Sequence, residues 1–181
     1  MKKQQLKETI NFLKSNGITS PAIGIVLGTG LGKLIAEILI EKEIAYSDIP
    51  NFPVATVEFH SGKLIYGSLS GKKVIVMAGR FHLYEGYNPW EVTYGIRVMH
   101  GLGIKNLLIS NAAGAINLNY KKGDLMLIED HINLQGSSPL AFQGANNFGN
   151  IFADMLAPYS AVLNTKIIAI AKAQNILLHQ G

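Results

Sequence analysis

Short, uninterrupted apolar runs recur along the chain, and this feature limits the possible folds more than any other. Their residues do not alternate between apolar and polar, which is typical of strands that are buried on both faces. Strands of this kind belong to sheets that are covered by helices. The clearest runs are residues 22–28, 63–69, 73–79, 106–110 and 124–130.

A segment of helical character, residues 88–103, separates two of these runs. Asn88 is a favourable N-cap, Pro89 suits the first turn, and Glu91 stands at the capping-box position. Gly101 and Gly103 are expected to end the helix. Because a strand, a helix and a second strand follow one another here, the segment predicts a crossover unit and an α/β fold.

Residues 62–75 predict a different connection, a β-hairpin that turns at Ser70 and Gly71. A hairpin makes two strands antiparallel, whereas a crossover makes them parallel. We therefore predict an α/β fold with a mixed central β-sheet flanked by helices.

The remaining segments are assigned from composition and spacing. Residues 1–17 predict an amphipathic surface helix, and residues 160–178 predict a second helix. Residues 135–150 are rich in Gly, Ser and Asn and predict a long loop. We expect a single α/β domain over residues 1–181.

The composition is that of a globular chain, with 48% hydrophobic and 15% charged residues. The absence of cysteine excludes a disulfide framework and a thiolate metal site, and it fits a cytoplasmic location. The net charge of +4 comes from scattered lysines, so we expect small anions rather than nucleic acid as partners. Lys33 and Glu37 interrupt the longest apolar stretch, and no membrane span is expected.

Three glycines follow the first predicted strand in IVLGTGLGKLI, residues 25–35, and a helix is expected after them. This arrangement points backbone N–H groups at an anion, and Thr29 adds a hydroxyl group. The spacing differs from the dinucleotide-binding pattern. It also differs from the phosphate loop of nucleotide hydrolases, which has Ser or Thr where this chain has Leu34. An anion site and a glycine turn that only packs both remain open.

Polar residues follow the strand at 73–79 in the sequence GRFHLYEGY. Arg80 offers a planar donor fork that suits phosphate, and His82 can lie beside it on extended chain. Taken alone, His82 is more often structural, but together with the glycine cluster it favours a small-oxyanion site without a metal. Tyr84 is expected either to contact a sugar hydroxyl or to pack half-buried.

A third cluster follows the strand at 106–110, where small residues leave the backbone open to a flat ligand. A tight turn is the alternative. All three clusters lie after strands, which is where open α/β sheets bind ligands. His60, which stands before Ser61 and Gly62, is interpreted as a ligand contact on a mobile loop. No spacing of His, Asp and Glu predicts a metal site.

With these clusters assembled, the sequence resembles the trimeric class of purine nucleoside phosphorylases. The resemblance covers almost the whole chain and lies in LGTGLG, FHSGKLIYG, GRFHLYEGY, NAAGAIN, GDLMLIEDHINL and FADM, in family order. The related methylthioadenosine phosphorylases have a different arginine–histidine loop. The resemblance implies the nucleoside phosphorylase fold, incomplete at its C-terminus, and no cofactor, with orthophosphate as a co-substrate.

The resemblance also implies an activity and a set of roles. Orthophosphate would attack C1′ of a purine ribonucleoside or deoxyribonucleoside and release the free base and the sugar 1-phosphate, in a homotrimer. By the same resemblance, His60, Arg80 and His82 are the catalytic candidates. The binding candidates are Thr29, His60, Arg80, His82 and the Ala112 N–H for phosphate, Tyr84 for ribose, Ala113 and Gly114 for the base, and Phe152 for the neighbouring subunit's site.

The sequence departs from the family pattern in several places. Ala115 stands where glycine is common, and Leu156 and Ala157 stand where polar residues are usual. Family members continue beyond this length with the residues that recognise the purine, so the sequence does not fix the base preference. We expect the 181-residue chain alone to be impaired. A non-catalytic phosphate-binding or subunit-interaction module is the alternative.

Overall fold

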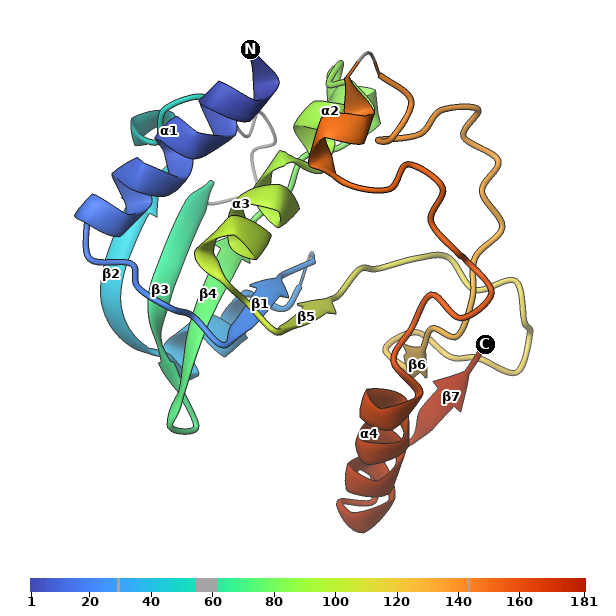
Figure 1. The fold of residues 1–181 in the computed structure, drawn as a ribbon. Coiled ribbons are helices and arrows are strands. Elements are labelled where there is room, and N and C mark those ends of the chain that lie inside the picture. Colours follow the sequence, from blue (N-terminus) through green and yellow to red (C-terminus); the bar gives the residue numbers. More distant parts are fainter. Residues whose placement is uncertain (29, 55–61, 143) are drawn as a thin grey trace. The chain divides into compact units, whose positions relative to one another are not determined.

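The computed structural model describes residues 1–28, 30–54, 62–142 and 144–181 (Figure 1). Its backbone forms two compact units. The first unit contains residues 1–112 and 138–148, and the second contains residues 113–137 and 149–181.

The first unit is built on a five-stranded sheet with the strand order β2-β3-β4-β1-β5. The sheet is mixed, as predicted, because β1 runs parallel to β4 and β5 while β3 runs antiparallel to β2 and β4. The strands are β1 (Ile23–Val26), β2 (Leu39–Ala45), β3 (Lys63–Leu69), β4 (Lys72–Ala78) and β5 (Asn106–Ile109).

The hairpin between β3 and β4 confirms the predicted turn. Ser70 and Gly71 have φ angles of 46° and 74°. Two consecutive positive φ angles are typical of the tight type I′ hairpin turn, whose twist matches that of the flanking strands.

Strand β2 was not predicted, and the helix expected after the glycine cluster is short and of the 3₁₀ type. The chain forms the 3₁₀-helix η1 (Gly32–Glu37) and then enters β2. β2 is an edge strand that carries charges, and Glu43 pairs with Lys63 at 2.6 Å. Charged residues on an exposed edge protect it from further pairing, but they also remove the apolar pattern by which a strand is found.

Both faces of the sheet are buried, which explains the uninterrupted apolar runs. Along β4, Ile75 and Met77 belong to one core cluster, whereas Val74 and Val76 belong to another. Successive strand residues point to opposite faces, so these clusters lie on the two sides of the sheet. Helices cover the first side (Figure 1), and η1 contributes residues to the second.

The described part of the first unit contains α-helices as well as the 3₁₀-helices. The α-helices are α1 (Lys2–Ser15), α2 (Pro89–Val92) and α3 (Tyr94–Leu102). The capping box at Asn88 is confirmed: Glu91 N–H donates to the Asn88 side chain at 3.1 Å, and Asn88 N–H donates to Glu91 at 2.9 Å. The predicted single helix is divided at Thr93, and Gly103, with φ of 99°, ends α3.

A cation–aromatic cluster fixes residues 138–148 to the first unit. The Arg97 guanidinium lies 4.6 Å from the Trp90 ring centre and donates to the Pro139 carbonyl at 3.0 Å. Phe142 packs against Trp90 with ring centres 4.9 Å apart. Burial lowers the pKa of Arg97 from its ordinary value. The predicted loop is therefore held in place, although η4 (Ala145–Phe148) is its one regular element among the described residues.

The second unit contains a small parallel sheet and one helix. Strands β6 (Leu125–Leu127) and β7 (Leu178–Gln180) pair, and α4 spans Ala161–Ala173. The helix predicted over 160–178 is therefore too long, because the chain turns at Asn175 with φ of 55° and continues into β7. Ser160 caps the start of α4 by accepting from Leu163 N–H at 3.3 Å.

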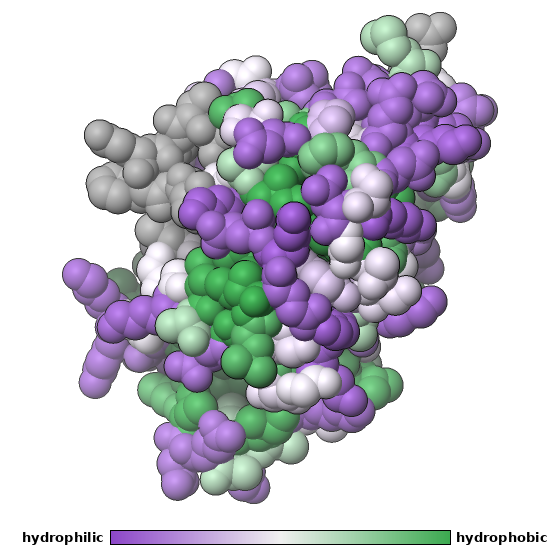
Figure 2. Space-filling model, turned by 90° about the vertical axis from the view of Figure 1, so that its left-hand side faces the viewer, coloured by the Kyte–Doolittle hydropathy of each residue, from purple (hydrophilic) through white to green (hydrophobic). Residues whose placement is uncertain are grey.

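The surface mixes hydrophilic and hydrophobic residues. Figure 2 shows one face, on which hydrophilic side chains surround a compact hydrophobic patch. Strand β2 exposes 76% of Leu39. Among the described residues, no helix combines the length and the apolar character needed to cross a membrane.

Candidate functional site

One residue from each of the three predicted strand-end clusters meets the others in the first unit. Because β1, β4 and β5 are parallel, their carboxyl ends lie at the same edge of the sheet. Gly28 follows β1, Arg80 follows β4 and Ser110 follows β5. Gly28 N–H donates to the Ser110 hydroxyl at 2.9 Å, and Arg80 Nη1 donates to the Ser110 carbonyl at 2.7 Å. Ser110, which the sequence did not single out, thus connects all three strand ends.

A chain of hydrogen bonds links Arg80, His82 and Glu85. Arg80 Nε lies 3.2 Å from His82 Nε2, and His82 Nδ1 lies 2.7 Å from Glu85 Oε1. A guanidinium can only donate, so His82 Nε2 accepts. The ring proton is then on Nδ1, which donates to the carboxylate. We call this arrangement the Arg80–His82–Glu85 chain.

Glu85 is the member of this hydrogen-bonded chain that was not predicted from the sequence. Its side chain is only 2% exposed, whereas that of His82 is 19% exposed. A buried carboxylate is stable only with hydrogen-bond partners, and Glu85 also accepts from the His82 backbone N–H at 2.8 Å. The available signal was an acidic residue three positions after His82, which is the capping-box spacing at the start of η3 (Leu83–Glu85).

Phe81 anchors the segment between Arg80 and His82 to the core. It is 2% exposed, and its ring centre lies 5.3 Å from that of Tyr46 and 5.7 Å from that of Tyr87. The Tyr46 hydroxyl donates to the Gly79 carbonyl at 2.7 Å, and burial raises the pKa of this phenol. The backbone on both sides of Arg80 is therefore tied to buried aromatic residues.

Replacing Gly28 by alanine is expected to lower the free energy of unfolding by about 2 kcal/mol, as overpacking does. A Cβ atom at Gly28 would lie 2.6 Å from the Ser110 carbonyl oxygen and 2.9 Å from Asn111 Cα, both of which are backbone atoms. Gly32 is a matched control, because a Cβ atom there meets nothing within 4 Å. Urea unfolding of both variants measures the difference, and equal stabilities would show that the close approach is not required.

The other predicted site residues are placed as follows. Tyr84 is 76% exposed, with its ring against His82. Ala112 is exposed and lies two residues after Ser110 in the first unit. Ala113, Gly114 and Phe152 are also exposed, and they lie in the second unit. Thr29 and His60 lie outside the described residues.

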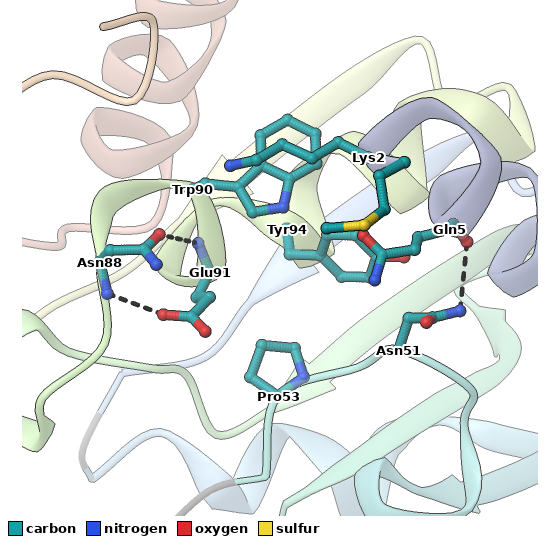
Figure 3. Close-up of a pocket in the computed structure, with 9 residues that line it drawn as sticks. Lys2, Gln5, Asn51, Pro53, Asn88, Trp90, Glu91 and Tyr94 are labelled. Carbon is teal, nitrogen blue, oxygen red and sulfur yellow. Dashed lines mark hydrogen bonds between the residues drawn. The ribbon is translucent and has the colours of Figure 1, made fainter. Parts of the chain in front are cut away.

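A surface pocket of about 230 Å³ lies elsewhere in the first unit (Figure 3). It is lined by Met1, Lys2, Gln5, Asn51, Pro53, Asn88, Trp90, Glu91 and Tyr94. Figure 3 shows that its hydrogen bonds connect lining residues to one another, Asn88 to Glu91 and Asn51 to Gln5. None of the strand-end residues lines this pocket, so we assign it to the packing of α1 against α2 and α3 rather than to chemistry.

The strand-end arrangement suits a small oxyanion. A guanidinium with an adjacent imidazole and backbone N–H groups supplies charge-assisted hydrogen bonds to oxygen atoms. Within residues 1–28, 30–54, 62–142 and 144–181, no group of three or more His, Cys, Asp or Glu side chains is placed to hold a metal ion.

Comparison with known proteins supports the resemblance seen in the sequence. The model of the phosphorylase superfamily matches residues 22–181. Purine nucleoside phosphorylase 1 of Bacillus subtilis is 45% identical over 179 residues, which are 99% of this chain and 66% of that protein. The corresponding enzyme of Geobacillus stearothermophilus is 45% identical over 181 residues, again with 66% of its length covered.

A solved structure agrees with the sequence comparison. Isoform 2 of purine nucleoside phosphorylase from Schistosoma mansoni, in complex with cytosine and ribose-1-phosphate, superposes with a TM-score of 0.91 at 41% identity. The match covers 98% of this chain and 64% of that one. The chain thus spans about two thirds of the length of these relatives. It belongs to the phosphorylase superfamily, as a member of its purine nucleoside phosphorylase family.

Proposed function

We propose that the protein catalyses the phosphorolysis of purine ribonucleosides and deoxyribonucleosides. The observation that carries the proposal is the Arg80–His82–Glu85 chain, which lies at the carboxyl ends of β1, β4 and β5 beside Gly28 and Ser110. The family supports the same reading, since the Schistosoma mansoni structure contains ribose-1-phosphate, a sugar phosphate of the kind that phosphorolysis produces.

In this proposal Arg80 and His82 bind orthophosphate. The guanidinium fork donates two hydrogen bonds to phosphate oxygens. His82 lies beside the guanidinium, and the Glu85 carboxylate at Nδ1 fixes the orientation of its ring next to the phosphate. The three residues thereby hold and orient the nucleophile next to the nucleoside, which makes the attack effectively intramolecular.

The reaction exchanges one bond at the sugar carbon for another. A phosphate oxygen forms a bond to C1′ while the bond from C1′ to the purine nitrogen breaks, and the departing base takes up a proton. The sugar develops oxocarbenium character in the transition state, as in other glycosyl transfers. The adjacent phosphate anion, held by Arg80, stabilises that positive charge.

The remaining roles in the proposal come from the family resemblance. Phe152 is 82% exposed, which leaves its ring available to the site of a neighbouring subunit in a homotrimer. A cytoplasmic location accords with a chain that lacks cysteine. The assigned residues are Thr29, His60 and the Ala112 N–H at the phosphate, Tyr84 at the ribose, and Ala113 and Gly114 at the base.

Replacing Glu85 by glutamine is expected to raise the KM for phosphate about 10-fold, because a charge-assisted hydrogen bond to His82 becomes a neutral one. The carboxylate is buried, so the solvent does not replace it. Glu43→Gln is the matched control, since it removes a carboxylate from an exposed ion pair with Lys63. Initial rates at varied phosphate concentration measure the effect. An unchanged KM in Glu85→Gln would remove Glu85 from the phosphate site.

The function itself is tested by incubating the protein with inosine and measuring hypoxanthine release with and without phosphate. Phosphorolysis predicts release that requires phosphate and saturates with it. Guanosine and adenosine in place of inosine determine the base preference. A folded protein that binds phosphate but releases base from none of these nucleosides would overturn the proposal in favour of an anion-binding module.

A further inference from the structure

Tyr84 has a contact that a ribose-binding role does not require. Its ring stacks on the His82 imidazole, with ring centres 4.6 Å apart and an angle of 14° between the planes. Tyr84 as a whole is 76% exposed. Among the described residues, no partner accepts or donates a hydrogen bond at its hydroxyl group. The part of Tyr84 with a contact to the described protein is therefore the ring.

The stack adds to the hydrogen bonds that orient His82. Arg80 Nε meets one edge of the imidazole at Nε2, and Glu85 Oε1 meets the other edge at Nδ1. Both hydrogen bonds are made at ring nitrogens, on the edge of the imidazole. Tyr84 covers one face. Stacking resists rotation of the imidazole out of the plane in which both hydrogen bonds are made.

We propose that Tyr84 is a positioning residue for His82, and that its ring holds the imidazole in the Nδ1–H tautomer with Nε2 directed at Arg80. The inference rests on the proposed function only in that His82 is expected to bind phosphate. The ring performs this role without the hydroxyl group. Contact with a ribose, in contrast, depends on the hydroxyl group, so two substitutions separate the roles.

The test compares Tyr84→Phe, which keeps the ring, with Tyr84→Leu, which removes it. The ¹⁵N chemical shifts of the His82 ring nitrogens report which nitrogen carries the proton, and His82→Asn identifies the signal. We expect the wild type and Tyr84→Phe to show the Nδ1–H tautomer. Tyr84→Leu is expected to shift both nitrogens towards the values of a tautomer mixture. Identical shifts in Tyr84→Leu and the wild type would overturn the inference.

Kinetics supply a second readout. Tyr84→Leu is expected to raise the KM for phosphate about 5-fold, the size of effect of a stacked aromatic pair, whereas Tyr84→Phe leaves it unchanged. If both variants raise the KM for the nucleoside by the same factor and leave the KM for phosphate unchanged, the Tyr84 ring has no positioning role. Thermal unfolding checks that both variants fold, as expected for an exposed side chain. If the wild type releases no base, the proposed function fails while the His82 shifts still decide this inference.

Discussion

Replacing Arg80 by alanine is expected to lower kcat/KM for phosphorolysis by about 100-fold or more, the usual effect of losing a preorganised charged donor. Arg80 donates to the Ser110 carbonyl and to His82 Nε2, so it connects the end of β4 with the end of β5. Its loss removes the guanidinium fork and also the hydrogen bond from Arg80 Nε to His82 Nε2. Most of the decrease is expected in the KM for phosphate.

Two further variants define what Arg80 contributes. Arg80→Lys keeps the positive charge but loses the planar fork, so an intermediate activity is expected. Lys72→Ala removes an exposed cation from β4, the strand that precedes Arg80, and is expected to leave the activity unchanged. If Arg80→Ala and Lys72→Ala have the same kcat/KM, the site described at the strand ends is not the phosphate site.

Replacing Phe81 by alanine is expected to lower the free energy of unfolding by about 4 kcal/mol, which is typical of truncating a buried phenylalanine. The ring is 2% exposed and lies among Tyr46, Phe52 and Tyr87, with ring centres between 5.3 and 5.8 Å away. Because Phe81 stands between Arg80 and His82, the variant is also expected to lose activity through displacement of both side chains.

Phe152→Ala is the matched control for stability, since this phenylalanine is 82% exposed and buries little surface. Its effect on the free energy of unfolding is expected to stay within about 0.5 kcal/mol. Urea unfolding at a common temperature gives both values. A Phe81→Ala protein as stable as Phe152→Ala would show that the aromatic cluster does not hold the Arg80–His82 segment.

The buried parts of the fold were predictable from the sequence, and the exposed edge was not. Strands β3 and β4 have apolar side chains on both faces, so composition alone identified them. β2 is half covered and carries charged residues, and its pairing with β3 decides its conformation. The helix expected after the glycine cluster is the 3₁₀-helix η1, whose six residues are too few to show an apolar period that tells the two kinds of helix apart.

The candidate site, too, was predictable from the sequence only in part. Arg80 and His82 were found because polar residues directly after a buried strand are unusual. Ser110 and Glu85 were missed because their importance lies in hydrogen bonds rather than in position. The hydrogen bond from Gly28 N–H to the Ser110 hydroxyl joins residues that are 82 positions apart in the sequence. Only the sheet order places those strand ends together.

The central claim is that phosphate, not water, attacks the sugar carbon. The most direct test is ³¹P NMR of the protein with inosine and orthophosphate, because it identifies the product. The account predicts a new resonance of a sugar 1-phosphate that grows in step with free hypoxanthine. Hypoxanthine that accumulates with free ribose and without a new phosphorus signal would contradict it, and would make the reaction a hydrolysis.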